Sequence, residues 1–341
     1  MQHHREISSS VAFERSVRHS ILHWYKHHAR HFFWREQHGK NPTPPDAYIV
    51  MVSEIMLQQT QTSRVQEKLP LFLATFPTLK ALANADNATV IKAWEGMGYN
   101  SRALRLRDCA KAIVNNHKSV IPSSVEDLLA LPGIGSYTAS AIAAFAYHQD
   151  VTVLDVNIRR VYSRLLRPMP TTISIAEENE IQQFAERIYP RGNASCWHQA
   201  VMDIGALFCT ARAPKCSACP LAVLCPSTGN MEEVKKSKRP EPSWNGIPNR
   251  IWRGRVVQIL RELEDEAGIT LAELYERLFQ QQNNTEPLFI NTDKHNSEGA
   301  WLLNLVQGLE RDEIVEIQQQ QGIEKVSWRD LSHCILRLYK G

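Results

Sequence analysis

The segment LPGIGSYTASAIAAFAYHQDVTVLDVN, Leu131–Asn157, decides the fold. Gly133 and Gly135 separate two predicted helices, over residues 125–131 and 136–147, because glycine permits positive φ and leaves backbone N–H groups uncovered. Such groups at the start of a helix suit a phosphate. An isolated pair of glycines would indicate only an ordinary helix–helix connection, but further motifs elsewhere in the chain accompany this pair.

Further motifs accompany the turn. SEIMLQQTQ occupies residues 53–61, GMGYNSRALRL starts at Gly96, LDVN ends at Asn157, and four cysteines follow from Cys209. In this order the motifs resemble the helix-hairpin-helix DNA base-excision glycosylases, and most closely the MutY branch, the adenine glycosylases. The resemblance extends over about residues 20–226 and does not reach the C-terminal third.

The resemblance implies a mainly α fold, with a helix-hairpin-helix glycosylase domain of two helical lobes over residues 1–208. It also implies an iron–sulfur cluster loop at 209–225. Residues 226–250 are rich in Pro, Gly and charge and predict a linker, and 251–341 predict a small winged-helix-like α+β module with β-prone runs near 313–317 and 323–327. Helical apolar spacing appears over 11–30, 47–59, 63–75, 88–95, 101–115, 125–131, 136–147, 156–166, 174–188, 194–208, 251–266, 270–281 and 298–311.

Charge is distributed unevenly along the 341 residues, although the formal net charge is only +3. Residues 251–341 hold 10 Lys and Arg against 15 Asp and Glu, which leaves +8 for residues 1–250. The first part should therefore bind a polyanion, whereas the acidic C-terminal domain is a poor phosphate clamp and a candidate contact for another protein. We expect an intracellular, cytoplasmic monomer that binds double-stranded DNA containing a mismatch or an oxidised base, with no membrane span.

Four of the seven cysteines cluster as C-x6-C-x2-C-x5-C: Cys209, Cys216, Cys219 and Cys225. Such clustering indicates metal ligation rather than disulfides, and zinc is the general alternative. The family resemblance favours a 4Fe-4S cluster held by four thiolates. Arg212 and Lys215 lie between the first two ligands, so the closed loop would present cations to a DNA backbone.

Two carboxylates are the candidate catalytic groups. Glu54 shares its predicted helix face with apolar residues, and burial would let it hold a proton near neutrality; a structural glutamate paired with an arginine is the alternative. The resemblance assigns Glu54 the role of the acid that protonates the departing adenine. Asp155 would stay ionised and stabilise the positively charged sugar, although its position also suits a helix N-cap. Asn157 would orient Asp155 or the attacking water.

Tyr137 stands where strand-cutting relatives of the endonuclease III type have a nucleophilic lysine. Because tyrosine cannot form a Schiff base, we expect a monofunctional glycosylase that leaves an abasic site. The resemblance also suggests that the Tyr137 hydroxyl bonds the catalytic acid. An aromatic anchor at the start of the helix is the alternative.

Gln59 and Tyr99 resemble the family residues that enter the base stack when the target nucleotide is extruded, which offsets part of the unstacking cost. For Tyr99, a core tyrosine is the alternative. Two departures limit the resemblance. Val156 stands where the family usually has glycine, and residues 251–341 do not resemble the nudix-like domain that MutY proteins append to recognise 8-oxoguanine.

Three hypotheses follow for function. The first is hydrolysis of the N-glycosidic bond of adenine mispaired with guanine or 8-oxoguanine. The second is removal of thymine or uracil opposite guanine. The third is a non-catalytic iron–sulfur regulator that binds DNA, and the negative charge of the C-terminal domain counts against it.

Overall fold

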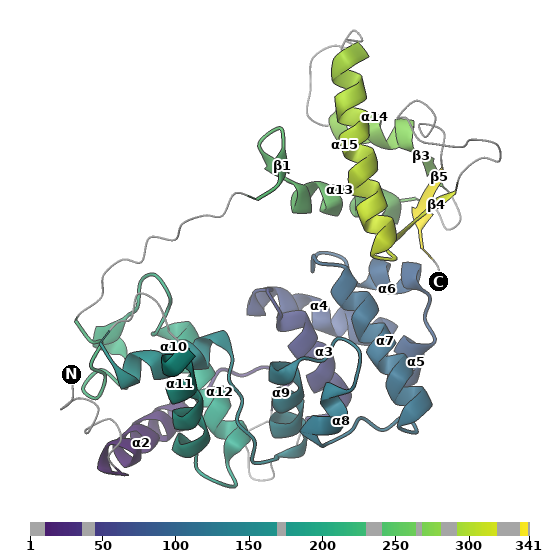
Figure 1. Ribbon diagram of the computed structural model, residues 1–341. Helices are drawn as coiled ribbons and strands as arrows, with labels where there is room; N and C mark the ends of the chain where they lie inside the picture. Colours follow the sequence, from purple (N-terminus) through teal and green to yellow (C-terminus); the bar gives the residue numbers. More distant parts are fainter. Residues whose placement is uncertain are drawn as a thin grey trace. The chain divides into compact units, whose positions relative to one another are not determined.

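The computed structural model describes residues 11–35, 45–168, 175–229, 241–263, 268–280, 292–318 and 335–339. The chain folds into two compact units, each built from two separated stretches of sequence. The first unit comprises Met1–Gln58 with Val120–Ser237, and the second comprises Gln59–Ser119 with Lys238–Gly341. The fold is mainly α (Figure 1), as the sequence predicts.

In its described residues the first unit is helical, with one short 3-10 turn. Its elements are α2 (Val11–His28), α3 (Ala47–Leu57), α8 (Val125–Leu129), α9 (Ser136–Tyr147), α10 (Val156–Leu166), α11 (Ile175–Ile188), α12 (Ala194–Leu207) and η1 (Cys216–Ala218). The α3 helix packs on α9, and α12 packs on α10 and α2. Small buried side chains on α9, such as Ala139 and Ala143, allow the close packing against α3.

The turn between α8 and α9 is built as its sequence predicts. Ser124 caps α8, because its Oγ accepts from the backbone N–H of Asp127 at 3.1 Å, and it donates to the Asp127 carboxylate at 2.7 Å. Gly133 has φ 74°, a value that L side chains rarely adopt. Gly135 is the N-cap of α9. This turn gives the chain its helix-hairpin-helix (Figure 1).

The second unit joins a helical lobe to the C-terminal module. The lobe contains α4 (Thr62–Thr75), α5 (Leu79–Ala83), α6 (Asn87–Ala93) and α7 (Ser101–Asn116). The module contains β1 (Ser243–Trp244), β2 (Ile247–Pro248), α13 (Asn249–Arg261), β3 (Ile269–Thr270), α14 (Leu271–Gln280), α15 (Thr292–Arg311), β4 (Val315–Gln318) and β5 (Ile335–Leu338).

The C-terminal module has the α+β composition that the sequence predicts. In the part of the module that the structure describes, α13, α14 and α15 accompany an antiparallel sheet of order β3-β5-β4. The register pairs Ile317 with Leu336 and Ile269 with Leu336, so β5 is the central strand. Leu336 is fully buried, and Trp252 on α13 is buried with it in the interior of the module.

Several boundaries differ from the expectations. The predicted linker over 226–250 is wrong at its end, because residues 243–248 form a hairpin and α13 begins at Asn249. Asn245 and Gly246 both have positive φ, the backbone that an Asn-Gly hairpin turn requires. The five-residue α5 is too short to show helical periodicity. The β-prone run at 313–317 overlaps β4, whereas 323–327 lies outside the described residues.

No helix in the described ranges is long and apolar enough to cross a membrane.

Candidate active site

Glu54 lies on α3, whose N-cap is Asp46; the Asp46 carboxylate accepts from the Tyr48 backbone N–H at 2.7 Å. The Glu54 side chain is only 6% exposed. Burial raises the pKa of Glu54 from its ordinary 4.5 to about 7, and the charge of Asp155 adds to the rise. A hydrogen bond from Tyr137 and the positive charge of Arg35 oppose it. Glu54 therefore exchanges a proton near neutral pH, as general acid–base catalysis requires.

Tyr137, in the first turn of α9, donates its hydroxyl to Glu54 Oε2 at 2.7 Å. Burial, and then the negative charges of Glu54 and Asp155, raise the pKa of Tyr137 well above its ordinary value. The phenol therefore stays protonated and acts as a donor. Because it occupies one carboxylate oxygen of Glu54, the other oxygen is left to carry the exchangeable proton.

Asp155 caps α10 and is also held from its side. Its Oδ1 accepts from the backbone N–H groups of Asn157 at 3.0 Å and Ile158 at 2.6 Å. Its Oδ2 accepts from the Asn157 amide at 2.7 Å. Burial raises the pKa of Asp155, and these hydrogen bonds oppose the rise. Capping and orientation by Asn157 therefore occur together, and they leave the two carboxylates in unlike environments.

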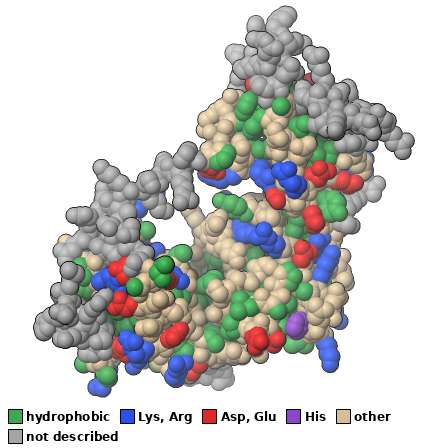
Figure 2. Space-filling view, in the orientation of Figure 1, with side chains coloured by type: hydrophobic (Ala, Val, Ile, Leu, Met, Phe, Trp, Pro, Cys, Tyr) green, Lys and Arg blue, Asp and Glu red, His purple; other side chains and the backbone are tan. Residues whose placement is uncertain are grey.

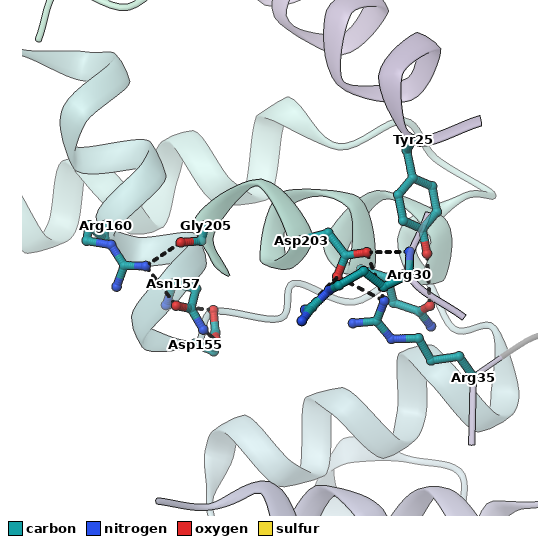
Figure 3. A network of polar contacts seen from close by, with 9 residues as sticks. Tyr25, Arg30, Arg35, Asp155, Asn157, Arg160, Asp203 and Gly205 are labelled. Carbon is teal, nitrogen blue, oxygen red and sulfur yellow. Dashed lines mark hydrogen bonds and ion pairs between the residues drawn. The ribbon is translucent and has the colours of Figure 1, made fainter. Parts of the chain in front are cut away.

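Asn157 is positioned in turn by Arg160, one turn along α10. The Arg160 Nη2 donates to Asn157 Oδ1 at 2.8 Å and to the Gly205 carbonyl at 2.8 Å, and its Nε donates to the Cys209 carbonyl at 2.6 Å. Figure 3 shows Arg160 reaching Asn157 and Gly205, which lies on α12. Gly205 is required for the close approach, because a Cβ there would lie 2.8 Å from the Asn157 Cβ.

A second polar network on α12 surrounds Asp203, which is fully buried. Its carboxylate accepts from Arg35 Nη1 at 3.0 and 3.1 Å and from the Arg30 backbone and side chain at 3.0 and 2.9 Å. Figure 3 shows both arginines converging on it. Asp203 thereby fixes Arg35, the cation that lowers the pKa of Glu54. Sequence analysis assigned no role to Arg35 or Asp203, which lie 168 residues apart in the chain.

His198 is a further residue that sequence reasoning missed. Its Nε2 accepts from the Val153 backbone N–H at 3.2 Å, two residues before Asp155, and its Nδ1 donates to the Ala194 carbonyl at 2.7 Å. Burial lowers the pKa of His198 to about 4, although the bond to Ala194 opposes this. A neutral imidazole therefore anchors the segment that leads to Asp155.

The cysteine segment is attached to the same helix. Arg164 of α10 donates to Cys209 Sγ at 3.1 Å, and its carbonyl accepts from Cys225 Sγ at 3.3 Å. Burial raises the pKa of Cys219 to about 11, and the nearby Cys209, Cys225 and Cys216 add to the rise. Four neighbouring thiols are the donor set of an iron–sulfur group, which binds them as thiolates. Within the described ranges, no group of three or more His, Cys, Asp or Glu is arranged to hold a single metal ion.

The remaining expected site residues are exposed. Arg212 and Lys215 lie on the surface of the cysteine segment, and Gly133 and Gly135 lie on the surface of the hairpin. On the face shown in Figure 2, Lys and Arg side chains form separate groups among acidic ones. Val156, where the resemblance is weakest, is 74% exposed at the start of α10. Of the other cysteines, Cys109 is fully buried and Cys196 partly so, while Cys334 lies outside the described residues.

Gln59 and Tyr99 belong to the second unit, and both have positive φ, 55° and 46°. Tyr99 is 54% exposed, which excludes a core tyrosine. Arg102 ties the two loops together, because its Nη2 donates to Thr60 Oγ1 at 3.1 Å and to the Gly98 carbonyl at 3.2 Å.

Comparisons with known proteins define the class. Residues 52–190 match the family described as HhH-GPD superfamily base excision DNA repair protein. Residues 209–225 match the iron-sulfur binding domain of endonuclease III. A solved structure titled as a thermostable thymine-DNA glycosylase aligns with 64% of this chain and 97% of its own, with a TM-score of 0.57 at 24% identity, and so shows the same fold. The fold and the two family matches are those of a helix-hairpin-helix DNA glycosylase with an iron–sulfur segment.

The chain belongs to the adenine DNA glycosylase family. It is 36% identical to the adenine DNA glycosylase of Mycobacterium tuberculosis over 75% of this chain and 81% of that relative. It is 34% identical to the Homo sapiens adenine DNA glycosylase over 67% of this chain and 42% of that longer relative.

Proposed function

We propose that the protein is a monofunctional DNA glycosylase that hydrolyses the N-glycosidic bond of adenine opposite guanine or 8-oxoguanine in double-stranded DNA. The observation that carries the proposal is the Tyr137–Glu54 pair, a carboxyl group with a pKa of about 7 bonded at 2.7 Å by a protonated phenol. It supplies a proton donor for a poor leaving group at neutral pH. Family membership supports adenine as the base.

In this mechanism Glu54 donates its proton to a ring nitrogen of adenine while the glycosidic bond breaks. The bonding electrons leave with the base, and positive charge develops on the sugar. Asp155, held by Asn157 and the start of α10, stabilises that charge. Glu54, now ionised, accepts a proton from the water that attacks the sugar carbon, and this returns the acid to its starting state. The products are free adenine and an abasic site.

Cys209, Cys216, Cys219 and Cys225 would hold the iron–sulfur group, which we propose is a 4Fe-4S cluster. Bound to four cysteines, it would cross-link this segment. Hydrolysis of a glycosidic bond transfers no electrons, so the reaction requires no redox role of the cluster. The segment between the first two ligands carries Arg212, whose exposed side chain would meet the phosphate backbone.

DNA backbone binding is also proposed for the hairpin. Gly133 and Gly135 are exposed, and within the described part of the chain no side chain caps the N-terminus of α9. The first N–H groups of α9 are therefore open to a phosphate, which the helix dipole also favours.

A panel of duplexes tests this function. Each carries one central pair: adenine opposite guanine, 8-oxoguanine or thymine, and thymine or uracil opposite guanine. After incubation and alkali, strand breaks should appear at adenine opposite guanine or 8-oxoguanine. Cleavage confined to thymine or uracil would establish the alternative base specificity instead.

Sodium borohydride tests the monofunctional assignment separately. The wild-type protein should not become trapped on DNA, since Tyr137 offers no amine. The Tyr137→Lys variant is the positive control, because lysine supplies an amine, and it should show weak trapping. Efficient trapping of the wild type would contradict the assignment.

A further inference from the structure

The C-terminal module contacts the loop that carries Tyr99, the residue that the family resemblance places in the base stack when the target adenine of the proposed reaction is extruded. Arg261, the last residue of α13, reaches this loop with its guanidinium group. Its Nε and Nη2 donate to the Ile91 carbonyl at 3.1 and 2.8 Å, and Nη2 also donates to Asn100 Oδ1 at 3.1 Å. Ile91 lies in the last turn of α6 and Asn100 precedes α7. Arg261 thus spans the two helix ends that flank the Tyr99 loop.

Two further contacts join the C-terminal module to the segment around α6. Gln258, one turn before Arg261, donates to Glu95 Oε1 at 3.1 Å. Asn87, at the start of α6, donates to the Glu313 carbonyl at 3.0 Å. Burial lowers the pKa of Arg261, and the charge of Glu95 opposes this. A partly desolvated cation on the carbonyl end of α6 also interacts favourably with the helix dipole.

The loop needs such support because its backbone is strained. Tyr99 has φ 46°, and Gly96 and Gly98 also have positive φ. A left-handed residue that is not glycine persists only where its surroundings fix it. From within the lobe, Arg102 bonds the Met97 and Gly98 carbonyls at 3.0 and 3.2 Å. From the C-terminal module, Arg261 fixes the far end of the loop through Asn100.

We propose that Arg261 is a positioning residue for base extrusion and that the C-terminal module is a brace for the Tyr99 loop. The inference rests on the proposed function. Residues 251–341 carry five more acidic than basic groups, so this domain is poorly suited to bind DNA phosphates. In the proposal it supports the Tyr99 loop instead.

The test compares Arg261→Gln with Arg250→Gln in the full-length, cluster-loaded protein. Arg250 lies on the same α13 and pairs with Glu241 at 2.9 Å on the surface, so its variant matches the lost charge. Single-turnover excision is measured with saturating enzyme on two duplexes. In one, adenine faces guanine. In the other, adenine faces an abasic analogue, so that extrusion breaks no base pair.

Arg261→Gln should slow excision from the guanine duplex about tenfold, the effect expected for losing hydrogen bonds to a charged group. On the abasic-analogue duplex its loss should shrink to about twofold or less, because little extrusion work remains. Arg250→Gln should stay within about twofold of the wild type on both duplexes, as expected for an exposed ion pair. Equal losses on both duplexes, or no loss on either, would overturn the proposal.

Asn100→Ala guards against a folding defect in Arg261→Gln. Among the described residues, the Asn100 side chain caps no N–H of α7, so its removal spares the helix. It should reproduce the duplex-dependent loss. A fluorescent 2-aminopurine at the target position reports extrusion without chemistry, and both variants should lower its signal. If the wild type released no adenine, the proposed function would fail, but the 2-aminopurine signal would still test the role of Arg261. A signal in the variants equal to that of the wild type would reject that role.

Discussion

Replacing Glu54 with glutamine should stabilise the folded protein above neutral pH while abolishing base release. Burial raises the pKa of Glu54 from 4.5 to about 7. Between these values the folded protein binds more protons than the unfolded chain, so this group makes stability fall as pH rises. Each tenfold change in proton affinity is worth about 1.4 kcal/mol, so ionising the buried Glu54 costs about 3 kcal/mol. Glutamine removes the charge and keeps an oxygen that can accept from Tyr137.

Urea denaturation of cluster-loaded wild type and Glu54→Gln, followed by tryptophan fluorescence across this pH range, measures the effect. The difference in free energy of unfolding should be near zero below pH 4.5 and reach about 3 kcal/mol in favour of Glu54→Gln above pH 7. Glu126→Gln, on the exposed surface of α8, is the matched control and should show no such dependence. A Glu54→Gln difference that does not change with pH would refute the reasoning, because it would mean that Glu54 is not perturbed by burial.

Three further outcomes are expected. Tyr137→Phe removes a hydrogen bond that lowers the pKa of Glu54, so the alkaline decline of the single-turnover rate should move to higher pH; an unmoved profile would argue against the pair. Gly205→Ala places a Cβ 2.8 Å from the Asn157 Cβ. It should lower stability by about 1–3 kcal/mol in thermal unfolding and slow excision more than it weakens DNA binding, whereas an unchanged rate would show that the close approach does not matter. The pKa of His198 is lowered from 6.5 to about 4. As pH falls between these values the unfolded chain binds the proton first, so the free energy of unfolding should decrease by about 3 kcal/mol. His198→Gln should lose this dependence in acid denaturation, and retention of the full dependence would assign it to other groups.

The opposed pH dependences of Glu54 and His198 overlap, so the wild-type stability curve hides both. Above pH 4.5 the contribution of Glu54 to the free energy of unfolding falls as pH rises, whereas the contribution of His198 rises with pH up to pH 6.5. Only the differences between variants and wild type separate them. A nearly flat wild-type profile is therefore compatible with two strongly perturbed groups.

Local patterns predicted much of the fold. Helices over 136–147 and 156–166 were predicted with the bounds that α9 and α10 have, because apolar spacing, the glycine turn and the Asp155 cap are all local signals. The strands of the C-terminal module were predicted poorly. Two-residue strands such as β1 and β3 have no periodicity, and their pairing depends on residues far away in the chain. The Asn-Gly turn at 245–246 was the one local signal for the β1–β2 hairpin.

The site divides in the same way. Motifs named Glu54 and Asp155, and the Tyr137 bond to Glu54 was expected from the family resemblance. The supporting residues could not be read from the sequence. Asp203 holds Arg35 across 168 residues, and His198 and Gly205 accept from Val153 and Arg160, each across 45 residues. Such contacts arise only when α12 packs against its neighbours, and no spacing along the chain reports them.

Direct detection of released base tests the central claim. Cluster-loaded wild-type protein is mixed in excess with a duplex holding one adenine opposite guanine, and the solution is assayed chromatographically for free adenine and on a denaturing gel with and without alkali. The mechanism predicts one adenine per duplex, strand breakage only after alkali, and neither product from Glu54→Gln. Absence of free adenine, or adenine release that persists in Glu54→Gln, would contradict it.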